Sequence, residues 1–279
     1  MIAIETHRVT RRFGTFTAVD ETDITVERGE VVGLLGANGA GKTTLMRMIL
    51  GLLEPSSGRV LLLGGPPTRE SRRRTGYVPQ GLGLYRDLTA QENLAFVAGA
   101  YGVQPGEAPA ASRGLIGSES LGVQRQIAFA AALQHDPDLL ILDEPTSGVA
   151  PLSRARLWEQ IRETADRGAA VLVSTHSMDE ARQADHLVLM HRGRVIGRGR
   201  EADIVGSTTA VAVETEDWHR AFSALDREGY PATLAGTVLR VPGETAEEIR
   251  RVLDGAGIEA TAATVRATLE EAMVLAERR

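Results

Sequence analysis

Cysteine is absent from the 279-residue chain. The chain can therefore form no disulfide, carry no thiolate nucleophile and bind no metal through sulfur. The absence suits a reducing compartment, where structural disulfides are rare. Any chemistry that the protein performs must come from other residue types.

Long apolar runs are also missing. No stretch approaches the roughly 18 consecutive apolar residues that a membrane-spanning helix needs. The first eight residues, Met1 to Arg8, lack the basic-then-apolar order of a secretion signal. We therefore expect that the chain does not cross a membrane by itself.

A basic excess is the third missing feature. The sequence has 31 Lys and Arg against 37 Asp and Glu, a net charge of −6. No broad phosphate-binding surface follows from that balance, so nucleic acid is not an expected partner. Hydrophobic residues make up 43% and charged residues 24%, as in ordinary globular proteins. The length allows an α/β core with a smaller appended domain.

Short apolar segments alternate with helical patterns up to about residue 205. Apolar runs typical of buried strands lie at 31–35, 60–63, 139–142, 170–174 and 187–190. Helical patterns lie at 41–52, 124–133 and 152–167. The last of these has Pro151 near its start and Gly168 just after its end, as helix boundaries favour. The alternation predicts an α/β fold, a largely parallel sheet sandwiched by helices.

Two stretches interrupt this alternation. Residues 103–118 are rich in Pro and Gly, which disfavour long helices, and a polar linker lies at 206–209. Beyond the linker, strands are expected at 211–213, 233–234 and 238–241, with helices at 218–228, 246–253 and 269–277. The predicted domains are 1–206, with a helical subdomain at about 81–135, and a small α+β accessory domain at 207–279.

The segment from Gly36 to Thr44 fits the pattern G-x-x-x-x-G-K-[ST] between a predicted strand and a predicted helix. Its glycines let the backbone N–H groups wrap a polyphosphate, and the helix dipole favours the negative charge. A chance glycine-rich turn is the alternative, and the strand–loop–helix setting argues against it. The predicted nucleotide-binding residues are Gly36, Asn38, Gly39, Ala40, Gly41, Lys42, Thr43 and Thr44.

Two of these residues have further predicted roles. Lys42 can reach the β- and γ-phosphates, and the Thr43 hydroxyl can bind Mg²⁺. A second strand, 139–142, ends in Asp143 and Glu144 at the sheet edge where ligands bind in open α/β sheets. Asp143 is the expected Mg²⁺ ligand, direct or through water, and Glu144 the expected base for an attacking water. An acidic turn without function is the alternative for this pair taken alone.

Together these motifs resemble those of ABC ATPases over about residues 2–205. Gly36–Thr44 resembles the Walker A motif, and 139–144 followed by Pro-Thr-Ser-Gly resembles Walker B and the segment after it. Residues 77–80 resemble the Q-loop, 173–176 the strand that ends in the H-loop histidine, and Phe13-Gly14 the aromatic A-loop. The C-terminal segment resembles the extension of drug-exporter-type ABC ATPases of bacteria.

The resemblance implies an ATP- and Mg²⁺-dependent ATPase that powers export through a separate membrane permease. It also implies a second nucleotide-binding domain as partner and a location on the cytoplasmic face of the membrane. Phe13 is expected to stack on adenine, or else to be a core aromatic. Gln80 is expected to sense Mg²⁺ and the attacking water and to relay motion to a partner. His176 is expected to contact the γ-phosphate, with Glu144, Lys42 and Gln80 as the other catalytic residues.

Three departures from the family pattern concern contacts between subunits. The family's LSGGQ signature, which clamps ATP on the opposite subunit, corresponds to residues 119–123. Ser120 and Gly122 are kept as ATP contacts, whereas Leu121 and Val123 replace a glycine and the glutamine, and Glu119 adds a negative charge. Ala150 stands where the family has an aspartate. The segment 103–118 is also short of the expected helices, so the helical subdomain looks trimmed.

The motifs that act within one chain are intact, whereas those that act across subunits are altered. This difference leaves two alternatives to a fully active homodimeric ATPase. The chain can be a weakly or non-hydrolysing regulatory subunit, or it can pair with a different ATPase chain. A GTPase is disfavoured because no NKxD guanine-reading motif is present. An ABC protein acting on ribosomes or DNA is disfavoured because paired ATPase domains and long inserted coiled coils are missing.

Overall fold

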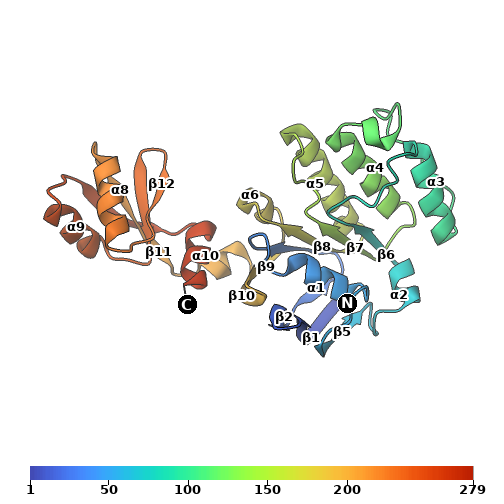
Figure 1. Ribbon diagram of the computed structural model, residues 1–279, viewed down its shortest axis with the longest axis horizontal. Helices are drawn as coiled ribbons and strands as arrows, with labels where there is room; N and C mark the ends of the chain where they lie inside the picture. The colour runs from blue at the N-terminus through green and yellow to red at the C-terminus, as the bar shows by residue number, and fades with distance from the viewer. Residues whose placement is uncertain (279) are drawn as a thin grey trace. The chain divides into compact units, whose positions relative to one another are not determined.

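The computed structural model of the chain describes residues 1–278, which form two compact units (Figure 1). The first unit ends at Arg198 and the second begins at Gly199. This division falls somewhat before the boundary expected at residue 206. Across residues 1–278, no helix combines the length and the apolar character needed to span a membrane.

A six-stranded sheet forms the centre of the first unit. Its pairs β4–β8, β4–β9, β7–β8 and β6–β7 are all parallel, which confirms the predicted α/β class. Parallel strands bring their carboxyl ends to one edge, where ligands bind in such sheets. The strand order is β10 (Arg194–Gly199), β9 (His186–His191), β4 (Val31–Leu35), β8 (Ala170–Thr175), β7 (Leu139–Asp143) and β6 (Thr75–Val78).

Both faces of this sheet are covered, and β7 shows how. Successive side chains of a strand point to opposite faces. Leu139 and Ile141 pack into the core cluster that also contains α1 (Lys42–Ile49), whereas Leu140 and Leu142 pack against α4 (Leu121–Leu133) and α5 (Pro151–Asp166). All five β7 residues are therefore buried, which explains the continuous apolar run in the sequence.

A second, antiparallel sheet lies on the far side of α1. It contains β1 (Ile2–Phe13), β2 (Phe16–Thr22), β3 (Thr25–Glu27) and β5 (Ser57–Leu62), and β1 pairs with each of the others. The run 60–63 was expected to belong to the parallel sheet, and this expectation was wrong. In β5 only Val60 and Leu62 are buried, because one face packs on the core and the other faces outward.

Helix α2 (Arg69–Arg73) precedes β6, and the helical part of the first unit follows β6. Helix α3 (Ala90–Tyr101) begins with a reciprocal cap between Thr89 and Glu92. Within the described chain, residues 103–115 form no helix, and a short 3₁₀ turn at Ile116–Ser118 leads to α4. Side chains hold this segment instead, since Gln91 and Gln134 both bond to the backbone of Gly106. The remaining helix of the unit is α6 (Met178–Ala181).

The second unit has the strand–helix–strand order of a ferredoxin-like fold. After α7 (Glu201–Val205) come β11 (Thr209–Glu214), α8 (Trp218–Arg227), β12 (Thr233–Ala235), β13 (Val238–Pro242), α9 (Ala246–Gly255) and β14 (Thr261–Arg266). The sheet order is β12-β13-β11-β14 and every pair is antiparallel. Apolar residues of α8 and α9 pack on the sheet in one buried cluster.

The last helix, α10 (Leu269–Glu277), is tied to the sheet of the second unit by a buried ion pair. Arg240 of β13 donates to both carboxylate oxygens of Glu271, at 2.6 and 3.0 Å. Burial opposes ionisation of Glu271, but the Arg240 and Thr268 hydrogen bonds outweigh it and hold the pKa of Glu271 below its ordinary value of 4.5. The pair therefore stabilises the docked helix most when Glu271 is ionised.

We expect Glu271→Gln to loosen α10 and to remove an acid sensitivity. A carboxyl with a depressed folded-state pKa stabilises the protein above its unfolded-state pKa, and that contribution is lost as pH falls through the folded-state value. The protection of the α10 amides, measured as their exchange rate relative to the intrinsic rate at each pH, should therefore fall below about pH 4.5 in the parent and much less so in the variant. Glu270→Gln, at an exposed position of the same helix, is the matched control and should behave like the parent. Equal exchange in Glu271→Gln and the parent at neutral pH would contradict the assignment.

Candidate functional site

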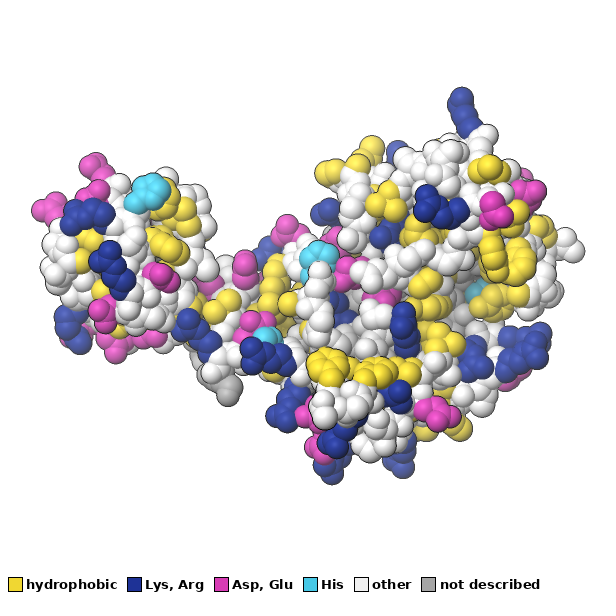
Figure 2. All heavy atoms as spheres, viewed as in Figure 1, with side chains coloured by type: hydrophobic (Ala, Val, Ile, Leu, Met, Phe, Trp, Pro, Cys, Tyr) yellow, Lys and Arg dark blue, Asp and Glu magenta, His cyan; other side chains and the backbone are white. Residues whose placement is uncertain are grey.

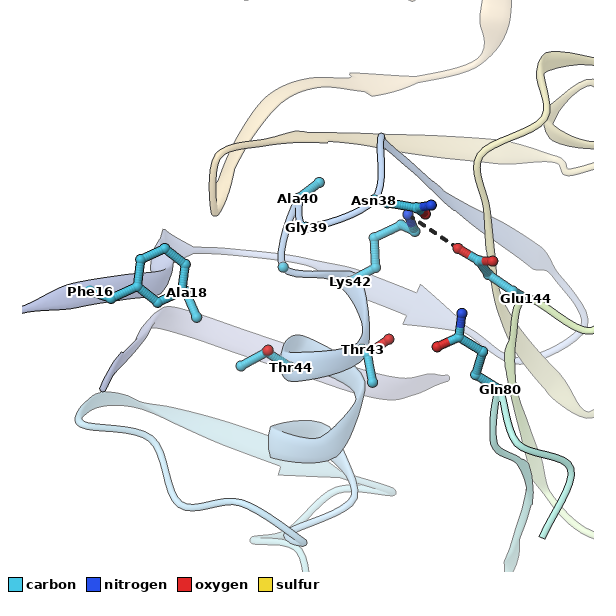
Figure 3. Close-up of a pocket in the computed structure, with 11 residues that line it drawn as sticks. Phe16, Ala18, Asn38, Gly39, Ala40, Lys42, Thr43, Thr44, Gln80 and Glu144 are labelled. Atoms are coloured by element: carbon cyan, nitrogen blue, oxygen red, sulfur yellow. Dashed lines mark ion pairs between the residues drawn. The ribbon is translucent and has the colours of Figure 1, made fainter. Parts of the chain in front are cut away.

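A pocket of about 290 Å³ opens at the carboxyl edge of the parallel sheet (Figure 3). The loop between β4 and α1 forms its floor, and Gln80 and Glu144 close one side. Of the eight residues predicted to bind a nucleotide through this loop, seven line the pocket, from Asn38 to Thr44. The full lining is Phe16, Ala18, Asn38, Gly39, Ala40, Gly41, Lys42, Thr43, Thr44, Gln80 and Glu144.

Two glycines of the loop are required by space and backbone conformation. Gly41 has φ of 103°, and a Cβ there would collide with the Ala18 carbonyl oxygen. A Cβ on Gly36 would collide with the Met190 carbonyl oxygen, so Gly36 lies behind the pocket lining and lets the loop approach β9. The first intrahelical bond of α1 runs from Leu45 N to Gly41 O. The N–H groups of residues 41–44 precede it and remain for an anionic ligand.

Lys42 is the buried cation of the pocket. Its side chain is only 5% exposed, and Nζ donates to the carbonyl oxygens of Gly36 (2.6 Å) and Ala37 (3.1 Å). Nζ also lies 3.6 Å from Glu144 Oε1. Burial lowers the pKa of Lys42, while the carboxylates of Glu144 and Asp143 act in the opposite direction. An incoming polyanion would supply the remaining negative charge that this buried ammonium lacks.

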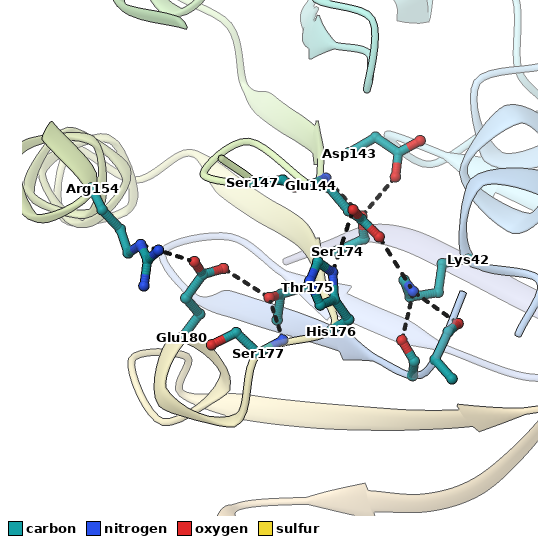
Figure 4. Close-up of polar contacts among 12 residues, drawn as sticks. Lys42, Asp143, Glu144, Ser147, Arg154, Ser174, Thr175, His176, Ser177 and Glu180 are labelled. Atoms are coloured by element: carbon teal, nitrogen blue, oxygen red, sulfur yellow. Dashed lines mark hydrogen bonds and ion pairs between the residues drawn. The ribbon is translucent and has the colours of Figure 1, made fainter. Parts of the chain in front are cut away.

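The two acids at the end of β7 are organised by one hydroxyl, Ser174 of β8 (Figure 4). Ser174 Oγ donates to Asp143 Oδ1 at 2.7 Å and accepts from the backbone N–H of Glu144 at 2.9 Å. Both acids are buried, with Asp143 1% and Glu144 7% exposed. Parallel pairing of β7 and β8 sets Asp143 opposite Ser174, so the contact follows from the sheet register.

Glu144 extends its carboxylate between two nitrogen groups. One oxygen lies 3.6 Å from Lys42 Nζ, and the other lies 3.4 Å from Nδ1 of His176, which follows β8. The backbone of Glu144 has φ of 50°, a left-handed conformation that costs a non-glycine residue roughly 1–3 kcal/mol. Such strain persists where the surroundings fix it, and here it aims the carboxylate at the pocket. Gln80, just beyond β6, lines the same pocket from the neighbouring strand end.

The residues present suit a hard divalent cation that is shared with a ligand. Asp143 Oδ2 is buried and has no hydrogen-bond partner among the described residues. The Thr43 hydroxyl and the Gln80 amide lie at the pocket and offer oxygen ligands. Within residues 1–278, no cluster of three or more His, Cys, Asp or Glu could hold a metal alone. The donor set therefore fits Mg²⁺, which usually takes one or two carboxylates and completes its shell with substrate phosphates and water.

The aromatic side chain at the pocket differs from the expected one. Phe13 was expected to stack on a base, but among the described residues the aromatic lining the pocket is Phe16. The two are opposite each other across the β1–β2 hairpin, and the ring of Phe13 lies under the Arg11 guanidinium at 4.6 Å. Phe16 is 63% exposed and is available to a planar ligand. Phe16 lies two residues from Ala18, on the same face of β2, and both line the pocket, but no local sequence signal distinguished Phe16 from Phe13.

The segment corresponding to the signature lies at the start of α4. Ser120 is its N-cap, with Oγ accepting from Val123 N, and Gly122 lies in the first turn beside Ser153. Neither residue lines the pocket of its own chain, among the lining residues described above. Their proposed contact with ATP on another subunit therefore stays a prediction.

Glu119 points into its own loop. Its Oε1 accepts from the backbone N–H groups of Arg113 (2.7 Å) and Gly114 (2.9 Å) and from the Ser112 hydroxyl (3.1 Å). These bonds, with the Arg113 amide first, hold the pKa of Glu119 below its usual value. The negative charge that Glu119 adds next to the signature therefore organises the irregular segment before α4.

Comparisons with known proteins point to one family. The profile described as ABC transporter matches residues 19–147. The chain is 40% identical over 217 residues to the probable multidrug ABC transporter ATP-binding protein YbhF of Escherichia coli K12, covering 72% of this chain but only 38% of that protein. It is 38% identical over 221 residues to the Nod factor export ATP-binding protein I of Burkholderia lata, covering 73% of each.

Solved structures agree on the fold. The ATP-binding subunit of an ABC transporter matches with a TM-score of 0.66 and 30% identity, over 72% of this chain and 91% of that one. A nucleotide-free ATP-binding cassette from an ABC transporter matches with a TM-score of 0.61 and 26% identity, over 72% and 92% respectively. These structures are α/β cassettes like the first unit.

Replacing Ser174 by Ala should destabilise the edge that carries both acids. The change leaves the Asp143 carboxylate and the Glu144 N–H buried without their shared partner, which typically costs about 1–3 kcal/mol. Urea unfolding of the purified chain should show a lower free energy of unfolding with an unchanged m-value. Ser118→Ala, which removes an exposed hydroxyl bonded to the Leu115 carbonyl, is the control and should cost far less. A parent-like midpoint for Ser174→Ala would refute the bridging role.

Proposed function

From the premise that the chain belongs to the ABC transporter ATP-binding proteins, we propose that it binds Mg·ATP and hydrolyses it to power a separate membrane permease. One observation carries the proposal: the buried Glu144 carboxylate reaches both Lys42 and His176 at the edge of the phosphate-loop pocket. A phosphate-binding floor with an acid beside it is what hydrolysis of a bound triphosphate requires.

Binding is assigned to the loop between β4 and α1. Its N–H groups and Lys42 hold the β- and γ-phosphates, and Phe16 offers a face to the adenine ring. A triphosphate would draw Lys42 Nζ away from the Gly36 and Ala37 carbonyls that it contacts in the structure. Thr43, Asp143 and Gln80 would hold Mg²⁺, which would neutralise charge on the phosphates. These residue roles are our proposal.

Hydrolysis is assigned to the pair at the pocket edge. A water oxygen forms a bond to the γ-phosphorus while the bond from that phosphorus to the bridging oxygen breaks, which gives ADP and phosphate. The Glu144 carboxylate accepts the proton of the attacking water, and His176 donates a hydrogen bond to the γ-phosphate. Gln80 lies on the opposite side of the pocket from the loop and positions the same water.

An exposed apolar surface supports a permease as partner. Tyr85 and Phe96 stack edge to face with ring centroids 4.9 Å apart, yet they are 48% and 56% exposed. Leu115, 49% exposed, lies on the strand-like bridge to Thr89 in the same part of the chain. Hydrophobic side chains gather over α3 on the face drawn in Figure 2. Exposed apolar clusters of this kind mark interaction sites. This cluster follows Gln80 along the chain. On our proposal it contacts the permease at the cytoplasmic side of the membrane.

Export is the proposed direction of transport. The relatives named above are a multidrug and a Nod factor export protein, and those names describe them alone. This chain spans 38% of the length of the E. coli protein, so that protein's full activity does not transfer directly. The chemical identity of the exported compound would be set by the permease.

A weakly hydrolysing subunit of a heterodimer is the second candidate. Leu121 occupies the first turn of α4 and is 40% exposed, at a position where the family clamps a phosphate with glycine. Ala150, the residue before α5, cannot provide the carboxylate of the family's inter-subunit contact. Both features concern contacts with a second nucleotide-binding domain, which an unlike partner chain could supply in complete form.

Replacing Glu144 by Gln tests the main proposal. Removing the base should lower ATP turnover by about 10²- to 10⁴-fold while ATP affinity is retained, so the variant accumulates bound ATP. Phosphate release and filter retention of radiolabelled ATP measure the two quantities. Lys42→Ala serves as the contrasting variant and should lose ATP binding itself. Parent-like turnover in Glu144→Gln would exclude Glu144 as the base, and a parent that binds but does not hydrolyse ATP would favour the second candidate.

Replacing each of the two hairpin phenylalanines by Ala in turn tests the contact with the adenine base. Phe16→Ala should weaken ATP binding by about tenfold, because stacking of a base on an aromatic ring is worth roughly 1–3 kcal/mol. Phe13→Ala, opposite it in the hairpin, should leave the affinity within about twofold. Calorimetry with ATP and with triphosphate alone separates adenine from phosphate contacts. The reverse order of effects would restore Phe13 as the stacking residue.

A further inference from the structure

A second polar cluster lies behind His176, and the roles assigned above do not use it (Figure 4). It joins Arg154 of α5, Thr175 at the end of β8, and Ser177 and Glu180 around α6. These side chains line a cavity of about 240 Å³ whose wall also includes Glu144 and His176. The cluster therefore touches the proposed catalytic pair from the side opposite the phosphate loop.

Glu180 is the centre of the cluster. It is a carboxylate with only 5% exposure, and such a charge is tolerated in the interior only when it is paired. One oxygen accepts from the Thr175 hydroxyl at 2.7 Å, and the other lies 3.4 Å from Arg154 Nε. Two different segments of the chain are thus fixed by one side chain.

The Thr175 hydroxyl fixes the backbone on both sides of His176. It belongs to the residue before the histidine, and it accepts a hydrogen bond of 3.0 Å from the N–H of Ser177, the residue after it. Glu180 sets the direction of this hydroxyl by accepting its hydrogen bond. The imidazole of His176 is itself 48% exposed and contacts Glu144, so its position depends on this short backbone clamp.

Arg154 connects the clamp to the segment that follows Glu144. Its backbone N–H donates to the backbone carbonyl of Ala150, within the first turn of α5. Residues 145–150 lead directly from Glu144 to that turn. The contacts therefore form a closed circuit from Glu144 through the 145–150 segment, Arg154, Glu180 and Thr175 to His176, and back to Glu144.

We propose that Glu180 is a positioning residue for His176, and that its ion pair with Arg154 passes displacements of the 145–150 segment to the histidine. The proposal rests on ATP hydrolysis at the neighbouring pocket. Arg154 is 38% exposed, so a contact at the surface can reach it directly. A second subunit touching the 145–150 segment would then alter His176 without contacting it.

Glu180→Gln tests the link because it keeps the shape and the Thr175 contact but removes the charge that pairs with Arg154. We expect ATP turnover at saturating ATP to fall by about tenfold, since small misplacements of catalytic groups have effects of that order or larger. ATP affinity, measured by calorimetry, should stay within about twofold. In a His176→Ala background the same change should lower turnover by less than about twofold, because residues that act through one another are not additive.

A matched ion pair on the same helix provides the control. Arg162 of α5 donates to both oxygens of Asp185 at 3.0 and 2.9 Å, and its side chain is 40% exposed, close to the exposure of Arg154. Arg162→Gln removes this pair and should leave turnover as in the parent at a temperature where all variants are folded. A loss equal to that of Glu180→Gln would show a general stability effect and overturn the proposal.

The Hε1 resonance of His176 gives a readout that does not need turnover. It is assigned by its absence in His176→Gln, and it should shift in Glu180→Gln and Arg154→Gln but not in Arg162→Gln. An unmoved resonance in Glu180→Gln, or equal turnover losses with and without His176, overturns the positioning role. If the resonance shifts as expected in the variants but the parent never hydrolyses ATP, the link is supported and the proposed function is excluded. The two failures are therefore distinguishable.

Discussion

The burial of Lys42 and Glu144 at the edge of one parallel sheet is the constraint on which the site depends. Neither charge would be stable there alone, because a buried ion needs a partner. Their separation of 3.6 Å leaves both groups only partly compensated. The surrounding design follows from this, with loop carbonyls beside the ammonium and His176 beside the carboxylate. On our proposal, a phosphate ligand would be a further negative partner for Lys42.

Much of the fold was accessible from the sequence. Strands β4, β7, β8 and β9 are buried on both faces, so they appear as continuous apolar runs, and the phosphate-loop pattern fixed the turn into α1. The antiparallel sheet was harder because each of its strands buries one face, and because β1 is interrupted by register shifts against its neighbours. Helix α3 was missed because its small residues give weak periodicity, although the Thr89–Glu92 cap marks its start.

The residues of the site also divide into those that the sequence could predict and those that it could not. Motif residues adjacent in sequence, such as Asp143 and Glu144, could be found from spacing alone. Ser174 and Glu180 could not, because the pairing of β7 with β8 brings Ser174 to the acids and the turn into α6 brings Glu180 to Thr175. Phe16 was missed for a related reason, since the hairpin decides which of two phenylalanines faces the pocket. Tertiary pairing carries information that local pattern lacks.

The left-handed backbone of Glu144 has a consequence for how this position can evolve. A glycine would adopt the same φ of 50° without steric strain, whereas a β-branched residue would be excluded. The conformation thus favours glycine, which would remove the carboxylate. If Glu144 is the base that we propose, keeping an acid there sacrifices some folding free energy for reactivity, a trade-off of the kind found where catalytic groups resist optimisation for stability.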